Sequence, residues 1–190
     1  MPRLLLLISL LLCLPGTSWA TENAGAGVSM GGGVGAFSPA PSAGGLVALP
    51  ALELAAAPGG TDQLQLRVRV PLFDTIYNGV VRQQFFFGAD VFLLKLGQCD
   101  CALGKHKVRP LAGPFVGARI NAGPGVVQPG LRLGGRFGAE YVGPQRRIGL
   151  TLAAEPWFEA RGGSAGPGRT TSAMGGGALI VLALTGYQAP

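Results

Sequence analysis

Beyond residue 20, the sequence lacks any apolar run long enough to cross a membrane as a helix. Such a helix needs about 20 residues, whereas the longest apolar run, 178–184, has only seven. Charge is also scarce, because charged residues make up 13% of the chain against about 25% in a typical soluble domain. The short apolar runs exclude helical membrane spans, while the scarcity of charge and the positive mean hydropathy indicate that much apolar surface faces an apolar solvent. These observations leave a soluble all-β domain or a β-barrel that crosses a membrane with strands.

Histidine and cysteine are too scarce for most catalytic and metal sites. The only histidine is His106, and the only cysteines beyond residue 20 are Cys99 and Cys101. Their spacing differs from that of a structural zinc site, so we predict no metal and no cofactor. An oxidising compartment could instead join Cys99 and Cys101 in a tight disulfide ring. His106 lies in a basic connection, 97–110, without a matching serine, and we therefore predict no enzymatic activity.

Basic residues outnumber acidic ones, and the formal net charge is +6. The arginines are spread along the predicted strands rather than clustered with aromatic residues. Nucleic-acid-binding surfaces require such clusters, so we predict no nucleic-acid partner.

Residues 1–20 have the pattern of a cleavable export signal. Arg3 supplies the positive charge, 4–14 form an almost unbroken aliphatic core, and Ser18 and Ala20 place small residues before the cleavage point. The apolar core is too short to serve as a membrane anchor. We predict cleavage after Ala20, export from the cytoplasm and one domain over 21–190.

Turn-forming residues divide 21–190 into eight segments of similar length. Clusters of Gly, Pro, Ser, Asp and Asn recur at nearly regular intervals, as they do between the strands of an all-β protein. The predicted strands are 27–37, 45–56, 63–73, 82–96, 112–122, 130–142, 146–159 and 173–187.

Side chains within these segments alternate with period two, the pattern of a strand with two different faces. In 63–73, for example, Leu66 and Val68 share one face while Arg67 and Arg69 take the other. The polar faces hold Gly, Arg, Asp and Glu, and only three lysines occur beyond residue 20. A water-exposed sheet face would carry more Lys, Thr and Ser. We therefore predict outward aliphatic and inward charged side chains, the inverse of a soluble barrel.

The predicted inner face sets six arginines against five carboxylates, Glu53 included. Arginines and carboxylates pair in a narrow lumen, and an unpaired buried charge costs several kcal/mol. Eight strands leave an interior just wide enough for side chains, so we expect an ion-pair network that closes the lumen. Its predicted members are Arg67, Arg69, Asp90, Arg119, Arg132, Arg136, Glu140, Arg147, Glu155 and Glu159.

Six aromatic residues fall near predicted strand ends, where membrane barrels carry aromatic girdles. We predict a girdle position for Phe85, Phe115, Tyr141, Trp157, Phe158 and Tyr187.

In its export signal, strand count and inverted polarity, the chain resembles the small eight-stranded outer-membrane β-barrel proteins of Gram-negative bacteria, typified by the membrane domain of outer membrane protein A. The resemblance covers 25–187. It implies an antiparallel up-and-down transmembrane barrel, both termini in the periplasm, a lumen plugged by side chains and insertion by the barrel-assembly machinery. Such proteins often end on an aromatic residue, and here Tyr187 would serve from three residues inside the terminus.

These inferences predict an integral outer-membrane protein with a structural or interaction role. We expect a monomer surrounded by outer-membrane lipid, and the sequence identifies no ligand. Two alternatives stay open: a small pore for ions or small solutes, and a soluble secreted β-sandwich that acts as a binding module.

Overall fold

The computed structural model describes residues 24–38, 45–56, 64–72, 74–77, 81–97, 107–123, 126–143, 148–164 and 170–187. Regular structure in these ranges consists of strands: β1 (Gly25–Ser38), β2 (Gly45–Ala56), β3 (Leu64–Pro71), β4 (Asp74–Tyr77), β5 (Val81–Leu96), β6 (Lys107–Gly123), β7 (Val126–Val142), β8 (Ile148–Ser164) and β9 (Thr170–Tyr187). None of the described residues forms a helix with the length and hydropathy needed to cross a membrane.

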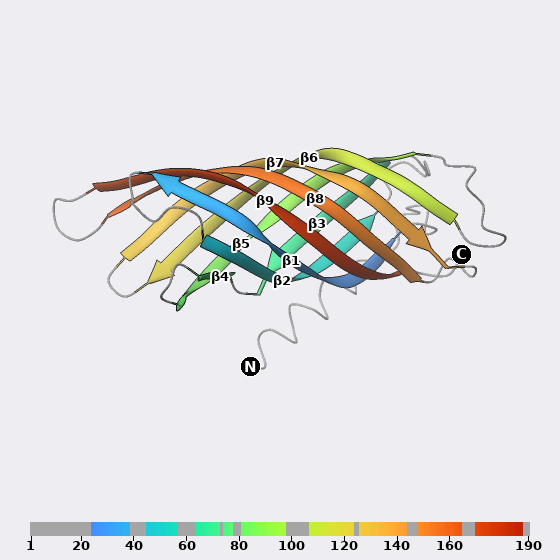
Figure 1. Cartoon of the computed structure of the whole chain (residues 1–190), viewed down its shortest axis with the longest axis horizontal. Helices are drawn as coiled ribbons and strands as arrows, with labels where there is room; N and C mark the ends of the chain where they lie inside the picture. The colour runs from blue at the N-terminus through green and yellow to red at the C-terminus, as the bar shows by residue number, and fades with distance from the viewer. Residues whose placement is uncertain are drawn as a thin grey trace, which may run out of the picture.

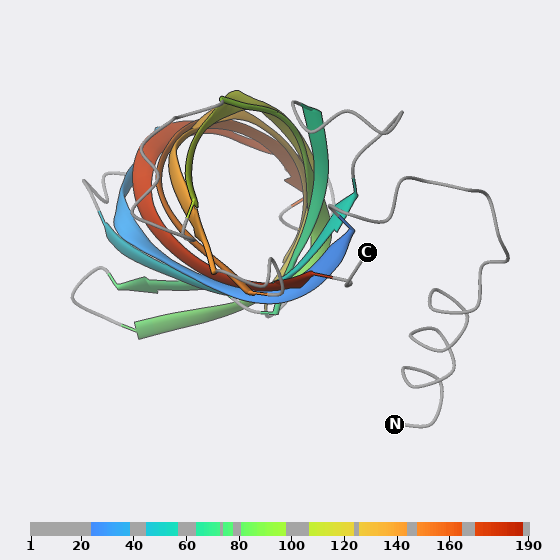
Figure 2. The same ribbon diagram turned by 90° about the vertical axis from the view of Figure 1, so that its right-hand side faces the viewer.

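The strands form one antiparallel sheet that closes on itself. Apart from β3 and β4, strands that follow one another in sequence pair, and β1 pairs with both β2 and β9 (Figures 1 and 2). β3 and β4 both lie between β2 and β5, so they are two halves of one strand and the barrel has eight strand positions. The predicted eight-stranded antiparallel up-and-down barrel is confirmed. The β-sandwich alternative is wrong, because the wall is a single closed sheet.

A β-bulge separates β3 from β4. Ala51 of β2 faces Pro71 and Ala48 faces Thr75, so the β3–β4 strand holds one residue more than β2 between these pairs. The Leu72 amide nevertheless donates to the Pro50 carbonyl at 2.9 Å. A bulge bends a strand and increases its twist locally, which accounts for the division of this strand into two.

The register fixes the stagger of the barrel. A path of paired residues leaves β1 at Gly25, passes once round the wall and returns to β1 at Gly35, a stagger of ten residues. Such a stagger requires strands tilted by roughly 35–45° from the barrel axis, and the tilt is visible in Figure 1. The interior of a barrel of this size is just wide enough for side chains.

Period-two alternation determines which side chains enter the barrel. Leu182 of β9 is 52% exposed on the outer surface, whereas its neighbours Val181 and Ala183 are buried. In β3, Arg67 and Arg69 are buried and Val70 is exposed. Apolar side chains therefore cover the outside of the wall, and the interior holds charged side chains together with apolar ones such as Val181.

Three aromatic residues depart from the predicted girdle. Phe115, Trp157 and Tyr187 are at most 7% exposed and are buried in the interior, so this prediction is wrong for them. Successive side chains of a strand point to opposite faces, and these three occupy positions that face inward, whatever their distance from a strand end. Phe158 and Tyr141 do face outward.

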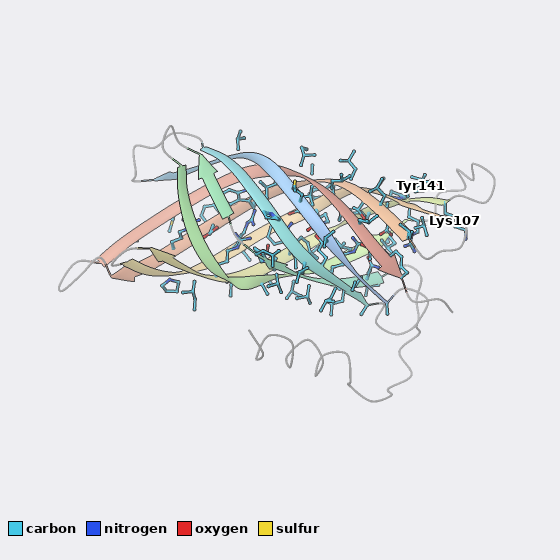
Figure 3. All side chains as sticks on the ribbon, turned by 90° about the horizontal axis from the view of Figure 1, so that it is seen from below. Lys107 and Tyr141 are labelled. Carbon is cyan, nitrogen blue, oxygen red and sulfur yellow. The ribbon has the colours of Figure 1, made fainter. Side chains whose placement is uncertain are left out.

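Tyr141 lies at the end of β7, beside the start of β6 at Lys107 (Figure 3). The side chain of Phe85 lies outside the described part of the chain.

Several strands run further than the sequence predicts. β6 begins at Lys107 rather than 112, and β8 continues to Ser164 rather than ending at 159. The sequence predicts Pro110 at the end of the 97–110 connection, yet Pro110 faces Ala139 in the β6–β7 ladder. Its carbonyl accepts a hydrogen bond from the Gly97 amide at 2.7 Å. A proline lacks only its N–H, so its carbonyl can still join a ladder.

Two prolines interrupt the ladders in the middle of the wall. Pro114 lies in β6, where pairing with β5 skips 93–94 and 113–114. Pro156 lies in β8, where pairing with β7 skips 135–136 and 155–156. The β6–β7 ladder between them is continuous from one end to the other. Over this region the outer surface has an apolar groove of about 740 Å³.

Candidate functional site

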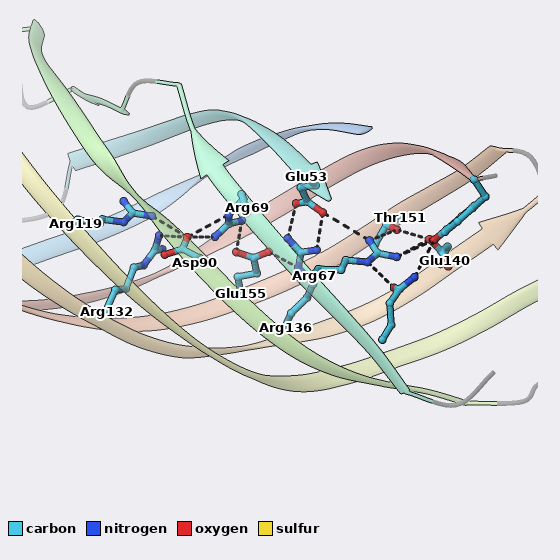
Figure 4. A network of polar contacts seen from close by, with 12 residues as sticks. Glu53, Arg67, Arg69, Asp90, Arg119, Arg132, Arg136, Glu140, Thr151 and Glu155 are labelled. Carbon is cyan, nitrogen blue, oxygen red and sulfur yellow. Dashed lines mark hydrogen bonds and ion pairs between the residues drawn. The ribbon is translucent and has the colours of Figure 1, made fainter. Parts of the chain in front are cut away.

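Buried arginines and carboxylates form a continuous network through the barrel interior (Figure 4). Near the end of the barrel where β9 stops, Glu140 accepts hydrogen bonds at 2.6 Å from both Arg67 and Arg109. The Tyr187 hydroxyl also donates to this carboxylate, and the Thr151 hydroxyl donates to it at 3.3 Å. Glu140 thus joins four strands, β3, β6, β8 and β9.

The middle of the network alternates strictly between cations and anions. Arg136 donates two hydrogen bonds to Glu53, at 2.7 and 3.0 Å, and its Nε donates to Glu155 at 2.6 Å. Glu155 also accepts from Arg69 at 2.7 Å. Glu53 lies 3.7 Å from Arg67, which links this part to Glu140. Fork-shaped pairing of this kind fixes orientation as well as charge.

The far end of the network converges on Asp90. Its Oδ2 accepts hydrogen bonds from Arg69 at 2.8 Å and Arg119 at 3.0 Å, and lies 3.7 Å from Arg132. The Arg132 guanidinium lies over the rings of Trp157 and Phe115, with centroid distances of 4.7 and 5.4 Å. Figure 4 shows Arg119 and Arg132 at one extremity of the network and Glu140 at the other.

Most predicted network residues lie together in the interior. Glu159, which faces Arg132 in the β7–β8 ladder, pairs with Arg161 at 2.6 Å. Arg147 lies outside the described residues, as do Cys99, Cys101 and His106. Arg109 and Arg161 were not predicted, because nearby Pro and Gly assigned them to turns. Continuing the period of two into those turns would have placed both on the inner face.

A cluster of buried apolar side chains shares the interior with the network. This buried cluster consists of Phe92, Leu94, Leu96, Leu111, Phe115, Ala153, Trp157, Leu179 and Val181. Arg69 and Arg136 both lie over the ring of Phe92, at 4.8 and 4.1 Å from its centroid. The charged network is thus packed against an apolar cluster rather than standing in an open channel.

Glycines on the inner face make room for the network. A Cβ added at Gly117 would lie 2.0 Å from Asp90 Oδ1, and one added at Gly149 would lie 2.9 Å from Glu140 Oε1. Asp90 is short and is held by several arginines, so it cannot swing away from a new methyl group. Gly117 therefore sets the space in which the far end of the network forms.

We expect Gly117→Ala to lower the free energy of unfolding by about 1–3 kcal/mol, the usual cost of overpacking. The matched control is Gly162→Ala, because a Cβ there would meet nothing within 4 Å. Urea titration of both variants measures the difference. Equal stability of the two would contradict the close contact at Asp90.

The network joins strands to one another by hydrogen bonds across the interior. Each carboxylate of the network accepts a hydrogen bond from at least one guanidinium group. Within the described residues, no group of three His, Cys, Asp or Glu side chains is placed to hold a metal ion. Comparisons with protein-family models, with curated proteins and with solved structures find no match.

Proposed function

We propose that this chain is an integral outer-membrane β-barrel protein with a structural or interaction role and no enzymatic activity. The observation that carries the proposal is the inverted polarity of the barrel. Four of the largest fully buried side chains are arginines: Arg67, Arg69, Arg132 and Arg136. Large hydrophobic side chains cover the outside, where their exposure reaches 66%.

An apolar solvent accounts for this arrangement better than water does. Monomeric soluble proteins rarely expose a continuous apolar patch larger than a few hundred Å², whereas outward aliphatic residues here occur on most strands round the wall. Interiors rich in charge and outsides rich in Leu, Ile and Val are typical of barrels embedded in lipid.

The height of the apolar surface suits a membrane. Outward-facing apolar residues of β8 run from Ile148 to Phe158, roughly 33 Å along a strand. With the strand tilt included, this is about 25 Å along the barrel axis, the height of the apolar band of an outer-membrane barrel. Tyr141 and Lys107, side by side at one end of the barrel, suit the interface between lipid and water.

The export signal supplies the route in this proposal. Residues 1–20 lie outside the described part of the chain, and their role as a cleaved signal rests on the sequence pattern alone. The protein would then cross the periplasm of a Gram-negative cell and reach the barrel-assembly machinery. It would insert as a monomer surrounded by outer-membrane lipid, with both termini on the periplasmic side.

Membrane fractionation combined with gel mobility tests the proposal. We expect the protein in the outer-membrane fraction, released only by detergent, and we expect the unheated sample to migrate differently from the boiled one. A barrel closed by buried ion pairs should resist the detergent of the gel until it is heated. Release without detergent and identical mobility before and after boiling would overturn the proposal.

The small-pore alternative has a separate readout in planar lipid bilayers. The packed interior favours a wall without steady conductance, because the network and the apolar cluster together occupy the lumen. A stable conductance that changes in Arg132→Ala or Glu155→Ala would instead assign a conducting role.

A further inference from the structure

We propose that the barrel interior binds a small inorganic anion beside Arg132, at the end of the network that faces away from Gly25 and Tyr187. The ligand class is an anion of the size of chloride or phosphate. This inference does not depend on the membrane location of the barrel, because it rests on the interior alone.

Arg132 is buried without enough hydrogen-bond acceptors. Arg132 is 1% exposed, yet its Nε and Nη1 atoms have no hydrogen-bond acceptor among the described residues. Asp90 Oδ2 lies 3.7 Å from the Arg132 Nη1 atom, which is beyond hydrogen-bonding distance. A buried charged donor without an acceptor is costly, so a group that accepts from Arg132 would stabilise the barrel.

Asp90 cannot neutralise its surroundings alone. Three guanidinium groups, from Arg69, Arg119 and Arg132, lie within 4 Å of its Oδ2. Elsewhere in the described network a carboxylate faces two guanidinium groups, as Glu155 faces Arg69 and Arg136. Glu159, which faces Arg132 in the β7–β8 ladder and pairs with Arg161, is the second carboxylate at this end. Guanidinium groups still outnumber carboxylates at the far end of the network, so a further anion would be attracted there.

Two aromatic rings hold Arg132 in this position. Its guanidinium lies over Trp157 at 4.7 Å and over Phe115 at 5.4 Å from the ring centroids. Stacking on a ring uses the face of the guanidinium and leaves its N–H edges free to donate. The aromatic rings thus fix the Arg132 guanidinium while its N–H groups remain able to donate, so the site is preorganised to bind an anion.

The cluster lies toward the end of the barrel opposite Gly25 and Tyr187. Asp90 faces Gly117 in the β5–β6 ladder, and Arg119 lies two residues further toward the end of β6 at Gly123. An anion that enters from that end would meet Arg119 and Arg132 before the alternating part of the network. The narrow interior admits only small ions, which sets the ligand class.

Trp157 provides a built-in reporter for the test. The chain has two tryptophans, Trp19 and Trp157, so full-length protein with Trp19→Phe has one fluorophore, 4.7 Å from the proposed ligand-binding guanidinium. Sodium chloride or sodium phosphate is titrated against sodium gluconate at constant ionic strength, with the protein in detergent. We expect a saturable change in Trp157 emission with at least one of the two small anions.

Matched variants separate this site from general charge effects. Arg132→Gln should weaken the apparent affinity about tenfold or more, since a hydrogen bond to a charged group contributes about 1.5–3 kcal/mol. Arg109→Gln, at the opposite end of the network, should keep the affinity of the parent. If Arg132→Gln does not fold, Arg119→Gln removes another cation of the cluster and should also weaken binding. Absence of saturation with both anions, or unchanged affinity in the folded cluster variant, overturns the inference.

Discussion

Glu155→Gln should lower the free energy of unfolding by about 3–5 kcal/mol, the cost of removing one partner from a buried ion pair. Glu155 is fully buried and accepts hydrogen bonds from Arg136 Nε at 2.6 Å and Arg69 Nη1 at 2.7 Å. Glutamine keeps the shape of the side chain and removes its charge. Two buried guanidinium groups would then lose part of their compensation at the centre of the network.

Urea unfolding in lipid vesicles, followed by fluorescence or gel mobility, measures this loss. A double-mutant cycle with Arg69→Gln provides the control, because the two residues share one hydrogen bond. The double variant should lose less stability than the sum of the two single variants, as coupled residues do. A loss below about 1 kcal/mol for Glu155→Gln, or strict additivity, would show that the network is not needed to hold the barrel together.

Leu182→Arg should destabilise the barrel in a bilayer by about 2–4 kcal/mol, the cost of a charge on the lipid face near the midplane. Leu182 faces outward from β9, and in the register it pairs with Met30 of β1 and Leu152 of β8, which also face outward. This row lies in the middle of the apolar surface. A guanidinium there could reach water only by distorting the surrounding lipid.

The matched control is Ile148→Arg, at the first residue of β8. Ile148 faces outward like Leu182, but at the edge of the apolar surface an arginine costs only about 0–1 kcal/mol. Unfolding of both variants in vesicles of one lipid gives the depth dependence. Equal and small losses at the two positions would mean that water, rather than lipid, surrounds the barrel.

Sequence alone predicts the two faces of the wall well. Side chains of a strand alternate strictly, so the pattern around Arg67 and Arg69 was sufficient to place them inside and Val70 outside. The same rule, applied beyond the predicted strand ends, would have found Arg109. It was missed because prolines and glycines indicate turns in most proteins, whereas here they lie within long, tilted strands.

Partners within the interior could not be predicted from the sequence. Arg136 and Glu53 are 83 residues apart in the chain, and they meet only because β7 and β2 face each other across a closed barrel. That meeting depends on the stagger of ten residues between Gly25 and Gly35. The stagger depends on the packing of all eight strands, so no local sequence pattern predicts it.

The prolines of the wall divide the closed sheet into parts that are joined less continuously to each other than they are within themselves. The β6–β7 ladder is complete, while the ladders on its two sides are interrupted near Pro114 and Pro156. Each of these two flanking ladders has fewer paired positions than the ladder between β6 and β7. Unbroken ladders link β8 to β9 and β9 to β1. The wall is thus a rigid panel built round β9 and a second panel, the β6–β7 hairpin, that can open locally as a unit without breaking the first.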